Sequence, residues 1–379
     1  MSLFFLTFLS MYGGVHVYAF LRARSVLGFG FGPGAGLAVF MLAMTAAPVV
    51  VRVLERQGYE LSARAFSYLA YLWMAALFLF FCGSVFLDLI NLVFRIAGWA
   101  LRLDIKAALI PTGISFIGTA CLSLLICIYG YVDAGNIRTE RLVIETTKLP
   151  AGTDRLTIVQ ISDVHLGLIV RCDKLDRILD AVRVAQPDLL VSTGDLVDAQ
   201  INHLPGLAER LRTITPKYGK FAITGNHEYY AGLEKALAFT KNAGFTLLRG
   251  EAKDIGALVI ACVDDPAALQ MKLGRPASDY SVLSTTDRKK FRLFLKHQPR
   301  VSPEAVGLFD LQLSGHTHKG QIWPFTYLSA LTYPMNAGRY ELPGNAILYV
   351  SRGSGTWGPP IRFLSPPEVT VIELVRKSS

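Results

Sequence analysis

The sequence has few charged residues, no cysteine motif and no basic run, and each shortage excludes a class of protein. Charged residues make up 18% of the 379 residues, whereas soluble domains average about a quarter. The five cysteines form no CxxC pair, which argues against a zinc knuckle and against a dense disulfide framework. Despite a net charge of +9, the Lys and Arg residues form no stripe with interleaved aromatic residues. The sequence therefore argues against nucleic acid as a partner.

The shortage of charge is concentrated in the first part of the chain. Residues 1–138 hold nine Lys or Arg and five Asp or Glu, whereas the remaining 241 residues hold 29 and 24, an ordinary globular balance. A bilayer core takes about 20 residues of helix. Four apolar runs reach this length, and each ends against Arg or Lys: 3–21, 27–51, 66–94 and 107–132.

These runs predict a multi-pass integral membrane region of about four helices over residues 1–135. A linker and first strand would follow over 136–155, and a second domain over 156–379. The side of the membrane on which that domain lies is not decided by the positive-inside rule, because the basic residues divide six against five between the two sides. Asp88 and His16 lie within apolar runs, which makes them candidates for a role inside the membrane.

After residue 138 the pattern changes to strand-like and helix-like segments in alternation. Helices are expected around 175–182 and 233–242, the second of them ended by Gly244. This alternation, with further strands in succession, predicts an α/β sandwich with two central sheets. The expected strands are 156–161, 187–192, 221–224, 245–248, 257–263, 308–313, 346–350 and 369–374.

Polar motifs follow several of these strands, and five of the seven histidines belong to them. Asp, Asn and His are ligands of divalent first-row metals, and open α/β sheets place their ligands just beyond the strand ends. Together the motifs predict a two-metal hydrolytic site. The motif residues are Asp163 and His165, Gly194-Asp195, Gly225-Asn226-His227-Glu228, His297, and Gly315-His316-Thr317-His318.

Each motif alone is a weak signal. A strand-end Asp such as Asp163 is often a helix N-cap, and Gly-Asp occurs at many turns. His297 is expected to follow a helical stretch, and His203 fits no motif and is interpreted as an ordinary surface histidine. The order of the motifs, with most of them at strand ends, favours a shared site.

In this order the motifs resemble those of the calcineurin-like metallophosphoesterase superfamily: D-x-H, G-D-x-x-D, G-N-H-[DE], H and G-H-x-H. Asp198 supplies the second Asp of the G-D-x-x-D motif. The resemblance covers about residues 150–375 and implies a four-layer sandwich of two mixed β-sheets flanked by helices. The segment 351–362 is similar to a membrane-associated or exported bacterial branch. Ala199 stands where protein Ser/Thr phosphatases of the superfamily carry Arg, which disfavours that activity.

The resemblance also implies a role for each motif residue. His227 would stay free of metal and act on the leaving group or phosphate, and Glu228 and Asp198 are candidates for orienting ligand histidines or are plain surface acids. Two divalent ions (Mn, Fe, Zn, Co or Ni) would be bound. One would be held by Asp163, His165, Asp195 and His318, and the other by Asp195, Asn226, His297 and His316.

These observations predict an integral-membrane phosphoesterase in which a metal-bridging hydroxide attacks a phosphate mono- or diester in line. An imidazole such as that of His227 can protonate the departing oxygen. Tethering favours phospholipid or nucleotide-linked lipid substrates. Two alternatives stay open: a tethered phosphodiesterase for soluble substrates, and a non-catalytic membrane sensor that only binds ligand.

Three further expectations concern the surroundings of the site. Arg352 and Lys319 are candidates for phosphate contacts by their position. The apolar segment around Trp323, Phe325 and Tyr327 would contact an acyl chain or, as the preferred expectation, pack against the rest of the protein. The resemblance to exported relatives favours an extracytoplasmic domain. The sequence does not decide the oligomeric state.

Overall fold

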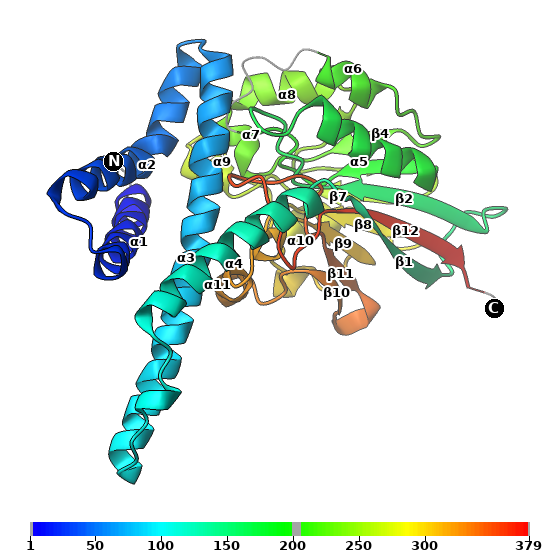
Figure 1. The fold of residues 1–379 in the computed structure, drawn as a ribbon. Coiled ribbons are helices and arrows are strands. Elements are labelled where there is room, and N and C mark those ends of the chain that lie inside the picture. The colour runs from blue at the N-terminus through cyan, green and yellow to red at the C-terminus, as the bar shows by residue number, and fades with distance from the viewer. Residues whose placement is uncertain (1–2, 199–205, 378–379) are drawn as a thin grey trace. The chain divides into compact units, whose positions relative to one another are not determined.

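The computed structural model describes residues 3–198 and 206–377, and the chain divides into two compact units. One unit comprises residues 1–131 and 359–361, and the other comprises 132–358 and 362–379. The first is built of helices and the second is an α/β domain (Figure 1).

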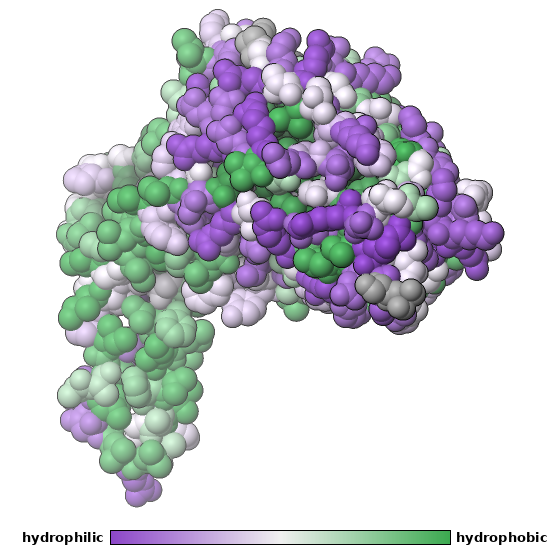
Figure 2. Space-filling model, turned by 90° about the vertical axis from the view of Figure 1, so that its right-hand side faces the viewer, coloured by the Kyte–Doolittle hydropathy of each residue, from purple (hydrophilic) through white to green (hydrophobic). Residues whose placement is uncertain are grey.

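The helical unit contains the four apolar runs expected from the sequence. They fall in α1 (Leu3–Leu27), α2 (Phe31–Arg56), α3 (Glu60–Leu101) and α4 (Thr112–Asp133). Within the described residues, α2, α3 and the segment Lys106–Asp133 are long and apolar enough to cross a membrane. The fourth span, in α1, stays a prediction. The surface of this unit is largely hydrophobic (Figure 2), which suits a lipid environment.

Asp88 and His16 of the helical unit both have hydrogen-bond partners on a neighbouring helix. Asp88 forms an ion pair of 3.0 Å with Arg22 and accepts a hydrogen bond of 2.8 Å from the hydroxyl of Tyr18. His16 accepts a hydrogen bond of 2.9 Å at Nε2 from the indole of Trp73, and its Nδ1 lies 2.9 Å from the carbonyl oxygen of Tyr12. Buried polar groups are stable when paired in this way, so these two residues join the helices of the unit.

The α/β unit is built on two six-stranded mixed sheets, as predicted. The first sheet has the order β1-β12-β2-β3-β4-β5 and the second β10-β11-β9-β8-β7-β6. The strands of the first are β1 (Arg138–Thr146), β12 (Glu368–Arg376), β2 (Arg155–Ile161), β3 (Leu189–Ser192), β4 (Lys220–Ala222) and β5 (Thr246–Leu247). Those of the second are β10 (Gly338–Glu341), β11 (Ile347–Val350), β9 (Leu311–Ser314), β8 (Arg292–Leu295), β7 (Val259–Cys262) and β6 (Ala252–Asp254).

Three hydrophobic layers hold the sandwich together. The two sheets face each other across one core, which includes Ile158 and Val191 from the first sheet and Leu293 and Leu313 from the second. Helices α5 (Cys172–Ala185), α6 (Leu207–Arg212) and α8 (Leu233–Asn242) cover the outer face of the first sheet. Helix α10 (Asp279–Leu283) covers the second sheet. Burial of this apolar surface is the main stabilising term of the unit.

The strand before His297 was not expected. Residues 292–295 form β8, whereas the sequence was interpreted as helical before this histidine. The four residues are buried and β8 pairs in parallel with both β7 and β9. A strand buried on both faces shows no alternation of apolar and polar residues, so periodicity does not distinguish it from a helix. The helices predicted around 175–182 and over 233–242 are present as α5 and α8.

Candidate metal centre

The predicted site residues lie just beyond the ends of strands from both sheets. In the first sheet, Asp163 and His165 follow β2, Asp195 follows β3, and Asn226 follows β4 and begins α7 (Asn226–Tyr230). In the second sheet, His297 follows β8, and His316 and His318 follow β9. Because parallel strands end at the same edge of a sheet, both sheets bring their polar loops to one place.

The backbone at this edge is held in an uncommon conformation. Asp163, His165, Asp195, His316 and His318 all have positive φ angles, between 49° and 72°. Residues other than glycine adopt this left-handed region rarely and at a cost of about 1–3 kcal/mol each. Backbone bonds hold the loops in place, such as those from Asp163 N to Gly194 O (3.1 Å) and from His165 N to Asp195 O (3.0 Å). Strain that is repeated at adjoining loops indicates a functional site.

Two glycines allow these loops to approach each other. Gly194 has a φ of +95°, and a Cβ at this position would lie 2.6 Å from Gly225 N and 2.8 Å from Nδ1 of His297. A Cβ on Gly225 would collide with the carboxylate of Asp195. The glycines of the two motifs are therefore required because the loops of β3 and β4 are in contact.

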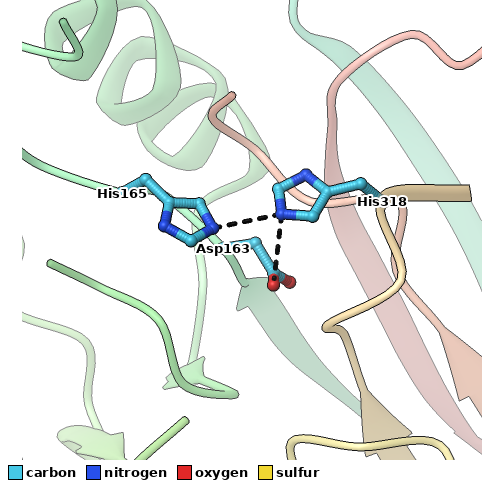
Figure 3. Close-up of side chains that lie close together, drawn as sticks. All are labelled: Asp163, His165 and His318. Atoms are coloured by element: carbon cyan, nitrogen blue, oxygen red, sulfur yellow. Dashed lines mark hydrogen bonds and ion pairs between the residues drawn. The ribbon is translucent and has the colours of Figure 1, made fainter. Parts of the chain in front are cut away.

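The first cluster of potential ligands consists of Asp163, His165 and His318 (Figure 3). The Nε2 atoms of the two histidines lie 3.1 Å apart, and Nε2 of His318 lies 3.6 Å from Oδ1 of Asp163. Ser162 Oγ and the backbone N–H of His316 donate hydrogen bonds to the Asp163 carboxylate. These bonds fix the carboxylate so that it faces the two imidazoles.

The second cluster consists of Asp195, His297 and His316. Nε2 of His297 lies 3.2 Å from Oδ2 of Asp195, 3.2 Å from Nδ1 of His316 and 3.2 Å from Oδ1 of Asn226. The side-chain oxygen of Asn226 therefore lies beside the three residues of this cluster.

Asp195 lies between the two clusters. Its Oδ2 is 3.8 Å from Nε2 of His165 and 3.2 Å from Nε2 of His297. Its Oδ1 accepts a hydrogen bond of 2.8 Å from the backbone N–H of His227. A carboxylate in this position can bridge two cations.

The hydrogen bonds of His297 show why a cation fits here. Its Nδ1 lies 2.8 Å from the carbonyl oxygen of Thr193, so Nδ1 carries the proton. In a neutral ring the lone pair would lie on Nε2 and point at the oxygens of Asp195 and Asn226, which would repel it. Burial lowers the pKa of His297, but Asp195 outweighs burial and raises that pKa well above its usual value. Positive charge is therefore favoured at this point, and a metal ion would supply it.

Burial disfavours the protonated form of three further imidazoles in the site. Burial lowers the pKa of His165 to about 3 and that of His316 to about 3, and it lowers the pKa of His318 as well. Metal ligation requires a neutral imidazole with a free lone pair. The burial that disfavours protonation thus prepares these side chains for a metal.

His227 faces the clusters and is held by an acid. Its Nδ1 lies 3.0 Å from Oδ1 of Asp198, and its ring lies 4.5 Å from the ring of His165, between centroids. Burial lowers the pKa of His227, but Asp195, Asp198 and Glu228 outweigh burial and raise it to about 9. A protonated imidazole at the edge of the site can donate a proton to a departing oxygen.

The two candidate orienting acids differ in what they hold. Asp198 contacts His227, the histidine expected to stay free of metal, whereas the sequence made Asp198 a candidate for orienting a ligand histidine. Glu228 is buried and accepts hydrogen bonds from the backbone N–H groups of Asp195, Leu196 and Gly225. It is therefore neither a surface acid nor the partner of a ligand histidine; it fixes the loop that carries Asp195.

Sequence reasoning missed several neighbours of the site. Arg362 is fully buried, and its guanidinium faces Nδ1 of His318 at 3.0 Å and donates to the carbonyl of Gly355 at 2.6 Å. The rings of Trp357 and Tyr230 lie 5.8 and 5.4 Å from that of His227. Arg362 and Trp357 both belong to the segment 351–362, which was singled out in the sequence by its resemblance to a bacterial branch. That resemblance did not indicate a function for either residue.

The expectations for Arg352 and for the apolar segment around Trp323 can also be compared with the structure. Arg352 forms ion pairs with Glu368 (2.8 Å) and Glu140, so its charge is already compensated. The preferred expectation that the segment around Trp323 and Tyr327 packs against the rest of the protein is wrong for these two side chains, because both are exposed. Ala199 and His203 lie outside the described residues.

Comparison with known proteins agrees with this geometry. Residues 156–320 match the family model of calcineurin-like phosphoesterases. An uncharacterized metallophosphoesterase of Aquifex aeolicus is 40% identical over 260 residues, which cover 68% of this chain and 99% of the relative.

Two further relatives are matched over part of their length. An uncharacterized metallophosphoesterase of Campylobacter jejuni is 34% identical over 65% of this chain and 67% of its own length. A transmembrane protein with a metallophosphoesterase domain from Danio rerio is 32% identical over 67% of this chain and 61% of its own.

Proposed function

The chain belongs to the calcineurin-like phosphoesterase family, and from this premise we propose that it is a membrane-integrated hydrolase that cleaves phosphate esters with two divalent metal ions. The metals would be held by the two clusters joined at Asp195. Asp163, His165 and His318 would hold one ion, and Asn226, His297 and His316 the other, with Asp195 shared between them.

The observation that supports this proposal most is the convergence of acceptor atoms around Asp195. Imidazole nitrogens, carboxylate oxygens and an amide oxygen point at one another over 3.1–3.8 Å in a buried site. Such an arrangement is stable only when protons or metal ions lie between these atoms. Metal ions, when bound there, would polarise the phosphate and supply a nucleophilic oxygen from water.

The side chains of the protein would perform the remaining steps. His227 would donate the proton that the leaving oxygen needs, and Asp198 would hold its ring in position for that transfer. Glu228 would keep the Asp195 loop rigid through its bonds to three backbone N–H groups. Trp357 and Tyr230, beside His227, would contact the part of the substrate that leaves.

The substrates are proposed to be lipid-linked phosphate esters, such as phospholipids or nucleotide-linked lipids. The apolar helices that precede the α/β unit support this, because they hold the site near a bilayer. A soluble phosphodiester is the competing substrate class. We further propose an extracytoplasmic domain, from the resemblance of residues 351–362 to a membrane-associated or exported bacterial branch.

The test is hydrolysis of a chromogenic phosphodiester and monoester by the full chain in nanodiscs with Mn²⁺. Wild type should turn over at least one ester, whereas Asp195→Asn and His227→Ala should lose most of the activity. Asp180→Asn is the matched control, since Asp180 is an exposed acid paired with Arg183 on α5. Wild-type protein that binds two metals and hydrolyses neither ester would contradict the proposal and favour a sensor that only binds ligand.

A further inference from the structure

Helix α11 (Phe325–Thr332), directly after the last metal motif, has an unusual surface. It has the sequence FTYLSALT, without a charged residue, and none of its residues is buried. Soluble proteins rarely expose a continuous apolar patch of this kind unless it binds something. Six large apolar or aromatic side chains are exposed on this helix and beside it: Trp323, Phe325, Tyr327, Leu328, Leu331 and Leu364.

These side chains belong to one continuous patch. Trp323 and Tyr327 have ring centroids 6.5 Å apart. The backbone N–H of Trp323 donates a hydrogen bond of 3.1 Å to the carbonyl of Phe363, which places Leu364 next to the start of the helix. Trp and Tyr favour the boundary between lipid and water, where their rings are apolar and their N–H or O–H groups remain hydrated.

The patch is attached to the candidate metal centre. Oγ1 of Thr326, on α11, donates a hydrogen bond of 2.8 Å to the carbonyl of Lys319, which follows His318. At the other end of the helix, the ring of Tyr333 lies 5.1 Å from that of His316. Whatever α11 binds is therefore held beside two potential metal ligands.

The chain itself indicates what lies near the patch. The apolar segment that ends α4 stops at Asp133, and β1 begins at Arg138. The four residues between them span at most about 14 Å. The α/β unit is thus held near a bilayer, where an exposed apolar helix has a high effective concentration of lipid.

We infer that Trp323, Phe325, Tyr327, Leu328, Leu331 and Leu364 form a bilayer-docking surface that places the metal centre against the lipid headgroups. The aromatic and leucine side chains enter the interfacial layer, and a phosphate ester in the headgroup of a lipid reaches the metals without leaving the membrane. The choice of substrate rests on the proposed function, whereas contact with the bilayer does not.

Bilayer contact is measured with an added tryptophan in the full chain. Leu331 on α11 and Val184 on α5 are matched positions, with 80% and 79% of their surface exposed. Leu331→Trp and Val184→Trp are compared with wild type in nanodiscs that contain brominated phosphatidylcholine. The fluorescence added at position 331 should be quenched by the lipid by more than half, and that added at position 184 should be quenched only by aqueous acrylamide.

Two outcomes overturn the docking surface. Equal quenching of both positions by acrylamide alone would mean that α11 faces water. Blue-shifted emission at position 331 without quenching by either agent would mean that the protein's own helices or a second copy covers it.

Hydrolysis rates test whether contact with the bilayer matters for a lipid-borne substrate. Leu331→Glu should lower hydrolysis of a fluorogenic phosphodiester carried in vesicles by roughly 10-fold, because a charge in the interfacial layer weakens docking. It should leave a water-soluble phosphodiester unaffected, and Val184→Glu should change neither. Equal loss on both esters would contradict the inference. If wild type cleaves neither ester while position 331 is quenched by lipid, the proposed function fails and the docking surface stands.

Discussion

Two buried histidines, one in each unit, show how a structural histidine differs from a proposed metal ligand. His16, in the helical unit, is satisfied at both nitrogens, by the Trp73 indole and the Tyr12 carbonyl. His297, in the α/β unit, donates from Nδ1 to the Thr193 carbonyl but directs Nε2 at acceptors. Burial and residue type are the same, and only the second ring needs something that the protein does not supply. A network complete with neutral side chains indicates packing, and one that is complete only when a proton or a metal ion is added suits a cation site.

The largest effect on phosphoester turnover is expected from a change in the network around His297, and little effect is expected from a change in the network around His16. Asp195→Asn should lower phosphoester turnover by at least ~100-fold, because the shared carboxylate no longer holds both metals. The metal content measured by plasma mass spectrometry should fall as well. His16→Ala should keep the metal content and turnover of wild type. Loss of bound metal in His16→Ala would show that the two networks are not independent.

Removal of metal should destabilise only the α/β unit. At a free metal concentration of 100 times the dissociation constant, binding stabilises the native state by about 2.7 kcal/mol. Chelation should therefore lower the Tm of wild type, and added Mn²⁺ should restore it. Asp195→Asn should respond less to either treatment. A Tm that is the same with and without metal in wild type would contradict a metal-dependent site.

Substitution of Arg362 measures how much its hydrogen bonds beside the candidate metal centre contribute to the free energy of unfolding. Its guanidinium faces His318 and donates to several backbone carbonyls in a fully buried position. Arg362→Lys should cost about 2–3 kcal/mol of unfolding free energy, since an ammonium leaves some of these acceptors unpaired. Arg183→Lys, at an exposed ion pair, should cost less than about 0.5 kcal/mol. Equal stability of the two variants in chemical denaturation would refute this account of Arg362.

The smallest change in stability is expected from a substitution in the helical unit. Trp73→Phe removes the donor to Nε2 of His16 and leaves that nitrogen unpaired between helices. Hydrogen bonds between membrane helices contribute about 0.6 kcal/mol on average, so the loss should be of that order. Steric trapping in bicelles can resolve such a difference. Turnover and metal content should not change, and a fall in either would count against a purely structural role.

The sequence predicted which motif residues come together better than it predicted the strands and the buried neighbours that position them. Asp163, Asp195 and His316 were identified because Asp and His residues that follow successive strands in this order are typical of a metal site. The strand before His297 was missed because its four residues are buried and lack alternation. Arg362 could not be assigned from sequence, since its partners are backbone carbonyls brought together only by the fold.

The backbone of the site was also beyond sequence reasoning. Left-handed conformations are expected at glycine, yet here they occur at Asp and His residues whose neighbours hold them by hydrogen bonds. The exposure of α11 was mispredicted for a related reason. An apolar segment normally packs in the interior, and only the fold shows that none of the residues of α11 is buried.

The parallel pairing of β1 with β12 offers a way to determine which side of the membrane the α/β unit occupies. Arg138, close to the end of α4, pairs with Glu368, and Thr146 pairs with Arg376. Both strands therefore start at the end of this edge that follows α4 in the chain, and Arg376 lies about 25–30 Å from Arg138 at 3.3 Å per residue. A reporter enzyme or a protease-cleavable tag fused after the last residue would project from the far end of this edge. It would report on which side of the membrane the α/β unit lies.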